Sequence, residues 1–179
     1  MSAVPPRIAP GRGREIGPVN ALIAWVIARG MRSRQPPNVF TTLARHRKLF
    51  RPWLRFAGRL MPRGELPRAD SELLILRTAH NCGCAYEWGH HERLGRRAGL
   101  TPEQIEAARS AAPTALTERQ QLLLRAADEL HEGRELSQQL WDELRPLLSD
   151  VELIELCMLV GHYEMLAMTL NTLRVQPER

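Results

Sequence analysis

Residues 72–91 read Glu-Leu-Leu-Ile-Leu-Arg-Thr-Ala-His-Asn-Cys-Gly-Cys-Ala-Tyr-Glu-Trp-Gly-His-His. The stretch opens with an apolar run that suits the buried body of a helix, and Asn81 and Gly83 then provide a break. A second helix is expected over 84–97, with Gly99 as its C-terminal cap. The same stretch contains two of the three cysteines, three of the six histidines and two glutamates. We therefore expect two helices that meet at a candidate functional site.

Helical signals continue on both sides of this stretch. Thr101, Thr117 and Ser137 each precede a helical pattern as cap residues, and Pro102 suits a first turn. The period-two alternation that is typical of strands does not occur. Apolar residues at helical spacing predict helices over 19–31, 38–62 with an irregularity near Pro52, 67–81, 117–133, 137–144 and 149–173. The sequence therefore predicts an all-α fold, a compact multi-helix bundle with short connections.

The chain length of 179 residues fits one domain with a substantial core. Residues 1–18 hold four prolines and three glycines among scattered arginines, a composition that does not supply a packed helix or strand. We read them as an extended arm. The predicted organisation is an N-terminal arm and short helix over residues 1–37, followed by a helical domain over residues 38–179.

Composition excludes several classes of protein. Three cysteines are an odd count, and the N-terminus shows no secretory signal, so we expect a reducing, cytoplasmic location. The apolar run 21–28 is too short to cross a bilayer, which needs about 20 apolar residues. We expect a soluble protein with no membrane partner. The net charge of +5 comes from arginine-rich clusters without a recognition motif, so we expect a solvated basic surface and no nucleic-acid partner.

Four side chains of the second helix share one face. Cys84, Glu87, Trp88 and His91 fall at positions i, i+3, i+4 and i+7. Glu87 and His91 are close enough on a helix to form a hydrogen bond, and such a pair can pass a proton near neutral pH. Each residue taken singly also suits an ordinary structural role. The functional interpretation is favoured because the preceding helix brings Glu72 and His80 to the same break.

A metal site requires separate consideration. His80, Cys82, Cys84, His90 and His91 are acceptable zinc ligands by type, but their spacing matches no common zinc signature. We therefore predict no metal site. The Cys-Gly-Cys spacing also differs from the Cys-x-x-Cys of disulfide oxidoreductases. Cys157 lies in an apolar run and is predicted to be an inert core residue.

The spacing of three of these residues resembles a family signature. Glu72, then eleven residues, then Cys84, with His91 seven residues further on, is similar to the pattern of the carboxymuconolactone decarboxylase family, which includes the alkylhydroperoxidase D branch. The resemblance extends over residues 38–175 and includes the segment Val-Gly-His-Tyr-Glu-Met-Leu-Ala-Met-Thr-Leu-Asn near the end. It implies an alkylhydroperoxidase D-like helical fold and a homo-oligomer, namely a trimer, hexamer or dimer.

The resemblance also implies a chemistry. The peroxidase branch carries a Cys-x-x-Cys pair, but here Glu87 occupies the position of the peroxide-attacking cysteine, and a carboxylate cannot cycle through sulfenic acid. Decarboxylase-type members carry Glu-x-x-x-His, which Glu87 and His91 match. The expected function is cofactor-free acid/base catalysis on a small carboxylated lactone or related compound. The catalytic candidates are Glu72, Cys84, Glu87 and His91, and the substrate-binding candidates are Arg77, Tyr86 and Trp88.

Two alternatives stay open. One is a thiol peroxidase that works through Cys84, with Cys82 or Cys157 as the resolving thiol. The other is a non-enzymatic helical oligomer that binds a small ligand. Both use the same scaffold, because related folds host different functions.

Overall fold

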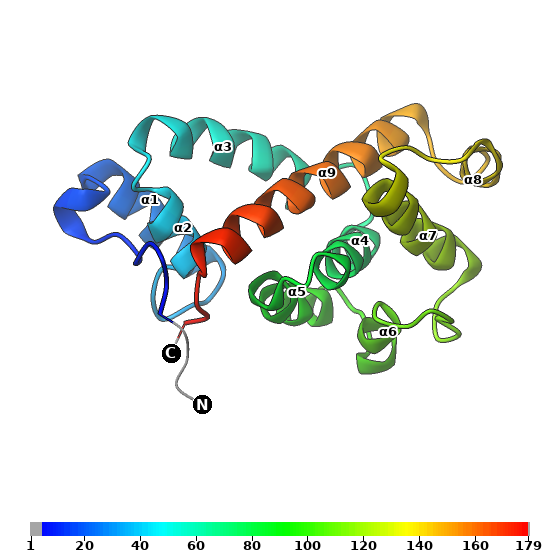
Figure 1. Cartoon of the computed structure of the whole chain (residues 1–179), viewed down its shortest axis with the longest axis horizontal. Coiled ribbons are helices and arrows are strands. Elements are labelled where there is room, and N and C mark those ends of the chain that lie inside the picture. The colour runs from blue at the N-terminus through cyan, green and yellow to red at the C-terminus, as the bar shows by residue number, and fades with distance from the viewer. Residues whose placement is uncertain (1–4, 179) are drawn as a thin grey trace. The chain divides into compact units, whose positions relative to one another are not determined.

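The computed structural model describes residues 5–178, and these residues form helices joined by turns, without a strand (Figure 1). The elements are η1 (Gly13–Glu15), α1 (Pro18–Gly30), α2 (Asn38–Leu43), α3 (Arg47–Leu60), α4 (Arg68–Asn81), α5 (Ala85–Arg97), α6 (Pro102–Ala107), α7 (Glu118–Gly133), α8 (Gln138–Leu144) and α9 (Asp150–Leu173). The predicted all-α class is confirmed. Thr101, Thr117 and Ser137 cap α6, α7 and α8 as predicted.

The chain divides into two compact units. Unit 1 comprises Met1–Gly58 and Thr169–Arg179, and unit 2 comprises Arg59–Met168. The predicted domain boundary between residues 37 and 38 stays a prediction. Every candidate site residue of the sequence analysis belongs to unit 2.

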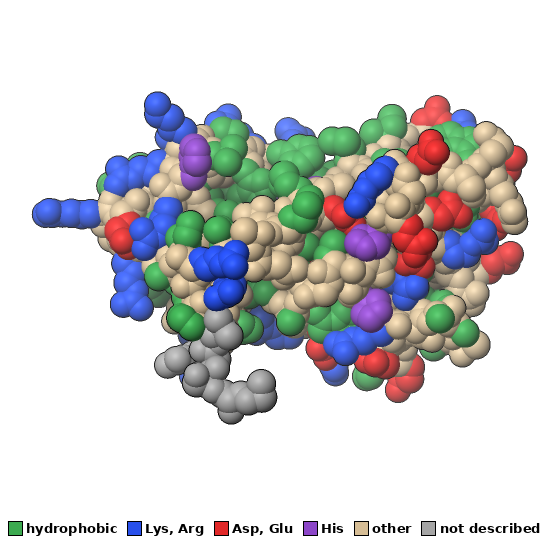
Figure 2. Space-filling view, in the orientation of Figure 1, with side chains coloured by type: hydrophobic (Ala, Val, Ile, Leu, Met, Phe, Trp, Pro, Cys, Tyr) green, Lys and Arg blue, Asp and Glu red, His purple; other side chains and the backbone are tan. Residues whose placement is uncertain are grey.

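Unit 1 contains the predicted N-terminal arm, of which residues 1–4 lie outside the described part. The arm docks on its own unit: Arg7 N–H donates to Leu173 O at 2.9 Å, and Gly11 N–H donates to Thr41 O at 3.1 Å. Eleven of the 25 basic residues fall within residues 1–58, where Glu15 is the single acid. Figure 2 shows lysine and arginine side chains over this unit.

The predicted helix over residues 38–62 was wrong at one point, because the structure divides it into α2 and α3. The division lies before Arg47 and not at Pro52, which sits inside α3. The imidazole Nδ1 of His46 accepts the Leu49 N–H at 3.2 Å and so satisfies one of the unpaired donors at the start of α3. Proline in an early turn removes only one helical hydrogen bond, so α3 continues through Pro52.

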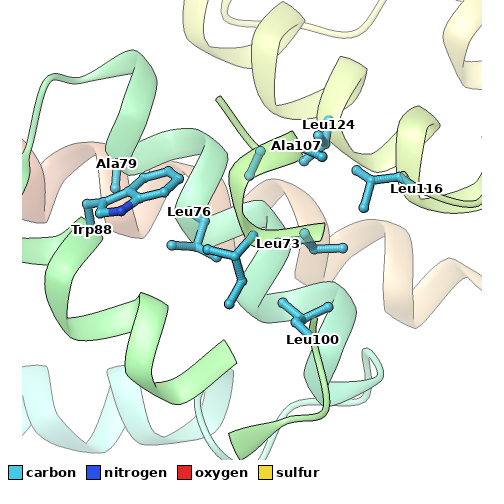
Figure 3. Close-up of a cluster of buried hydrophobic side chains, with 10 residues drawn as sticks. Leu73, Leu76, Ala79, Trp88, Leu100, Ala107, Leu116 and Leu124 are labelled. Carbon is cyan, nitrogen blue, oxygen red and sulfur yellow. The ribbon is translucent and has the colours of Figure 1, made fainter. Parts of the chain in front are cut away.

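Unit 2 is built around α4. Leu73, Leu74, Ile75 and Leu76 are at most 1% exposed, so α4 is covered on all sides, and it packs against α5 and α7. Figure 3 shows the buried cluster that joins these helices, made of Leu73, Leu76, Ala79, Trp88, Leu100, Ile105, Ala107, Ala108, Leu116 and Leu124. This packing fixes the register between α4 and α5.

The α4–α5 junction is as short as the sequence predicted. Asn81 is the last residue of α4, Cys82 caps it, and Gly83 adopts a φ of 59°. The Cys84 N–H returns to Ala79 O at 2.8 Å, so the turn satisfies a carbonyl at the end of α4 while Cys84 already caps α5. Glycine suits Gly83 because a positive φ is unfavourable for residues with a Cβ.

α9 is apolar on more than one face. By length and composition it is the helix in the described residues that is long and apolar enough to cross a membrane, but half of its most apolar 18-residue stretch is buried inside the protein, as in a core helix. Its exposed hydrophobic side chains are Val151, Ile154, Cys157, Met158, Met165 and Met168. The prediction that Cys157 is a core residue was wrong, because Cys157 lies on this exposed stripe.

Replacement of Leu76 tests the central position of α4. We expect Leu76→Ala to lower the free energy of unfolding by about 2–5 kcal/mol, because the side chain is fully buried and the change leaves a cavity. Leu147→Ala is the control, since Leu147 is 42% exposed and its loss is expected to cost less than about 0.5 kcal/mol. Urea denaturation measures both, and equal costs would contradict the central packing of α4.

Candidate active site

The site is built on a hydrogen bond between α4 and α5. His91 Nδ1 lies 2.7 Å from Glu72 Oε2, and these residues are 6% and 0% exposed. The other carboxylate oxygen, Glu72 Oε1, lies 2.5 Å from Arg68 Nη2 one turn earlier on α4. A carboxylate bound to one imidazole nitrogen fixes the ring orientation and leaves Nε2 as the reactive nitrogen.

The predicted hydrogen bond between Glu87 and His91 does not form, because Glu72 takes that place. Glu87 is 2% exposed, and among the described residues neither of its carboxyl oxygens meets a nitrogen or oxygen donor, so the Cys84 thiol is its polar neighbour. Burial raises the pKa of Glu87 to about 8, and the nearby Cys84 thiol lowers it by a smaller amount. Glu87 is therefore a neutral carboxylic acid near neutral pH, able to donate a proton.

Tyr163 of α9 lies near both Glu72 and Glu87. Its ring meets the His91 ring edge to face, with centroids 5.0 Å apart. Burial first, and then the charges of Glu72 and Glu87, raise the pKa of Tyr163 well above its ordinary value. The Tyr163 hydroxyl therefore stays protonated in the vicinity of both carboxyl groups.

Two further imidazole rings lie next to His91 and Tyr163. His90 lies beside His91, with ring centroids 5.5 Å apart, and His162 lies beside Tyr163, with centroids 5.2 Å apart. Burial, and to a smaller extent the charge of His91, lowers the pKa of His90 to about 3 and that of His162 to about 4. Both rings are neutral at physiological pH, so charge at the site is confined to few groups.

The two cysteines of the junction hold neutral thiols. Cys84 is 1% exposed, and burial followed by the charge of Glu87 raises its pKa to about 12. Burial, followed by the charge of Glu164, also raises the pKa of Cys82 to about 12. Because the thiolate is the nucleophile, neither environment favours thiol chemistry.

Arg77, the candidate for holding a substrate carboxylate, is engaged elsewhere in unit 2. Its guanidinium binds Asp128 through two bonds of 2.6 and 2.7 Å and donates to the carbonyls of Ala108 and Ser110. Arg77 also lines a cavity of about 280 Å³ together with Ser110, Gln121, Leu124, Arg125 and Asp128. Glu72, Cys84, Glu87 and His91 do not line this cavity, so the structure does not bring Arg77 to them.

The two aromatic candidates are buried. Tyr86 stacks on His90 with a 5° angle between the rings. Trp88 belongs to the core cluster and lies under the Arg109 guanidinium, 3.8 Å from the ring centroid. Tyr86 therefore contacts His90, the neighbour of His91, whereas Trp88 packs between α4 and α5.

Sequence reasoning missed Arg68, Tyr163 and His162. Arg68 stands four residues before Glu72, the spacing of an ion pair on one helix, and this signal was available. Tyr163 and His162 come from a helix some 70 residues beyond His91 in the chain. Both residues belong to the Val-Gly-His-Tyr-Glu segment, which is part of the family resemblance. That resemblance implied no role for them.

Replacement of Glu87 tests its buried, neutral state. The pKa of Glu87 is about 8 in the folded protein and about 4.5 in the unfolded chain. The folded state therefore keeps a proton that the unfolded state has lost, and the stability of the wild type falls as the pH rises from 4.5 to 8. Glu87→Gln keeps a neutral side chain. We expect the variant to gain stability relative to wild type by up to about 1.4 kcal/mol per pH unit across the interval.

Urea denaturation at a series of pH values measures this difference. Glu135→Gln, at an exposed glutamate, is the control and should show no such trend. A pH-independent difference for Glu87→Gln would contradict the assignment.

The chain resembles known proteins in sequence and in fold. The model of the carboxymuconolactone decarboxylase family matches residues 47–129. No curated protein sequence matches the chain significantly. Among solved structures, an uncharacterized peroxidase-related protein from Ralstonia eutropha JMP134 with an alkylhydroperoxidase AhpD core is 20% identical, with a TM-score of 0.83 over 98% of this chain and 94% of its own.

Two other solved structures share the fold. An uncharacterized peroxidase-related protein from Silicibacter sp. TM1040 is 17% identical, with a TM-score of 0.85 over 99% of this chain and 95% of its own. The debrominase Bmp8 is 16% identical, with a TM-score of 0.78 over 96% of this chain and 91% of its own. Residues 47–129 thus match the family model, and the solved structures share the fold of this chain.

Proposed function

We propose that this protein is a cofactor-free acid/base enzyme of the decarboxylase type, which acts on a small carboxylated lactone or a related compound. The observation that carries the proposal is the buried Glu72–His91 hydrogen bond beside a neutral Glu87. These groups supply one oriented imidazole and one carboxylic acid, the two proton-transfer partners that such a reaction requires. The Glu-x-x-x-His spacing of the family resemblance supports the same chemistry.

The proposed reaction breaks the bond between the substrate carboxylate and its neighbouring carbon. The electron pair stays on that carbon as an enolate, carbon dioxide leaves, and a proton from the acid completes the product. His91 delivers this proton from Nε2, while Glu72 holds the ring through Nδ1. Glu87 stands one turn before His91 on α5 without a direct hydrogen bond to it, so it returns a proton to His91 through a water molecule and recovers its own from solvent. Neutral neighbours such as His90 and Cys84 keep the site poor in charge, which favours loss of a charged carboxylate.

The structure favours this chemistry over a thiol peroxidase, although two proteins of similar fold are described as peroxidase-related. Cys84 is buried and its pKa is about 12, so little thiolate is present near neutral pH. Position 87, where the peroxidase branch has its attacking cysteine, holds a carboxylic acid.

The redox alternative is tested by a stoichiometric pulse of hydroperoxide. We expect Cys82 and Cys84 to stay reduced, because both thiols are neutral. Thiols are counted after unfolding in wild type and in Cys157→Ser, which removes the exposed thiol from the count. Rapid loss of a thiol in Cys157→Ser would show that Cys84 or Cys82 reacts and would support the peroxidase.

The acid/base role is tested by His91→Gln. We expect the variant to lower kcat by about 10²–10⁴-fold on any carboxylated lactone that wild type decarboxylates, because it lacks the transferable proton. Carbon dioxide release measures turnover, and deuterium incorporation from D₂O locates the proton in the product. His80→Gln, at an exposed histidine of unit 2, is the control and should keep full activity. Full turnover by His91→Gln would refute the assignment.

Self-association and a cytoplasmic location belong to the same proposal. The exposed apolar stripe of α9, with Ile154 at 66% and Met168 at 61% exposure, supports a homo-oligomer. Whether it is a trimer, hexamer or dimer stays a prediction.

A further inference from the structure

Three metal-binding side chains converge in unit 2 outside the proposed catalytic group. Cys82 caps the end of α4, His131 lies in the last turn of α7, and Glu164 lies on α9. Their donor atoms, a sulfur, an imidazole nitrogen and a carboxylate oxygen, all lie within 4.8 Å of one another. The proposed function uses none of these residues.

The distances suit a small divalent metal ion. Cys82 Sγ lies 3.5 Å from Glu164 Oε1 and 4.0 Å from His131 Nδ1. Zinc bonds of about 2.3 Å to sulfur and about 2.0–2.2 Å to nitrogen and oxygen place tetrahedral donors about 3.4–3.6 Å apart. An ion at the centre requires a shift of a few tenths of an ångström at Cys82. It requires a larger separation of His131 Nδ1 from Glu164 Oε1, whose hydrogen bond it replaces with two metal bonds.

The same atoms do not form a nucleophilic triad. In a Cys-His-Glu triad the thiol and the carboxylate bind opposite nitrogens of the imidazole ring. Here both Cys82 Sγ and Glu164 Oε1 approach the same nitrogen, Nδ1 of His131. Three donors around one point are the arrangement of a metal centre.

The surrounding contacts hold the three helices in place. One turn before the site, Asp128 of α7 binds Arg77 and accepts a 2.8 Å hydrogen bond from Asn81 of α4. This contact fixes the register between the ends of α4 and α7. Arg134 Nη1 holds the second carboxylate oxygen of Glu164 at 3.2 Å, which orients the first oxygen toward the site.

We propose that Cys82, His131 and Glu164 form a zinc-binding site in which water takes the fourth position. The His131 side chain is 31% exposed, so the site is open to an ion and to that water. Thiolate, imidazole and carboxylate are the ligands that zinc accepts, and binding displaces the Cys82 thiol proton. No sequence motif predicts the site, because its ligands come from three separate helices.

Cobalt substitution tests the proposal on full-length protein that carries no histidine tag and has been treated with a chelator. We expect one equivalent of Co²⁺ to produce the near-ultraviolet absorption of a cobalt–thiolate bond, and Zn²⁺ to displace it. Cys82→Ser should abolish the band, whereas the matched variant Cys157→Ser should keep it. Glu164→Gln should weaken the apparent affinity by more than about tenfold, the loss that removal of even an outer partner causes.

A second measurement separates loss of ligand from loss of fold. Zn²⁺ should raise the Tm of wild type and of Cys157→Ser, because an ion that binds only the folded state stabilises it. It should leave the Tm of Cys82→Ser unchanged while the circular dichroism spectrum stays helical. Absence of the cobalt band in wild type, or its persistence in Cys82→Ser, would overturn the proposal. These readouts require no substrate and are independent of the decarboxylase assays.

Discussion

The hydrogen bond between Glu72 and His91 is the contact on which the site depends, and it exists only because α4 and α5 approach closely. Gly95 of α5 lies at this approach: a Cβ at this position would meet Glu72 Cβ at 3.8 Å, an ordinary van der Waals contact, and Leu100 Cδ1 at 3.1 Å, a tight one. A buried carboxylate without partners is strongly unfavourable. Glu72 has a partner on each side, a hydrogen bond from His91 across the helices and an ion pair with Arg68 along its own helix. The site and the packing of unit 2 therefore depend on each other.

Charge is sparse around this contact. Glu87 is a neutral acid, His90 and His162 are neutral bases, and the Cys84 thiol is protonated, all because burial disfavours their charged forms. Proton transfer suits such surroundings, since it moves charge without a redox change. Proteins of similar fold include peroxidase-related proteins and a debrominase, so the scaffold itself does not select the chemistry. In the proposed mechanism the side chain at position 87 makes that selection.

The sequence predicted the helices well because their ends carry local signals. Thr101 and Thr117 cap their helices, and Gly83 ends α4, through contacts within a few residues. The partner of His91 was missed for the opposite reason. A spacing of four favours Glu87, but the side chain that reaches His91 is set by packing between helices. The exposure of Cys157 was missed because α9 is apolar on both its buried and its exposed faces. The periodicity of apolar residues then does not indicate which face is buried.

The turn at Gly83 sets a geometric condition on the whole site. Each residue of a helix advances the side chains by about 100° around the axis. Deletion of one residue between Cys82 and Ala85 would therefore rotate the sequence of α5 by about that angle against α4. Glu92 would then stand at the place from which His91 faces Glu72. The length of this junction, and not only the identity of its residues, specifies which side chains meet.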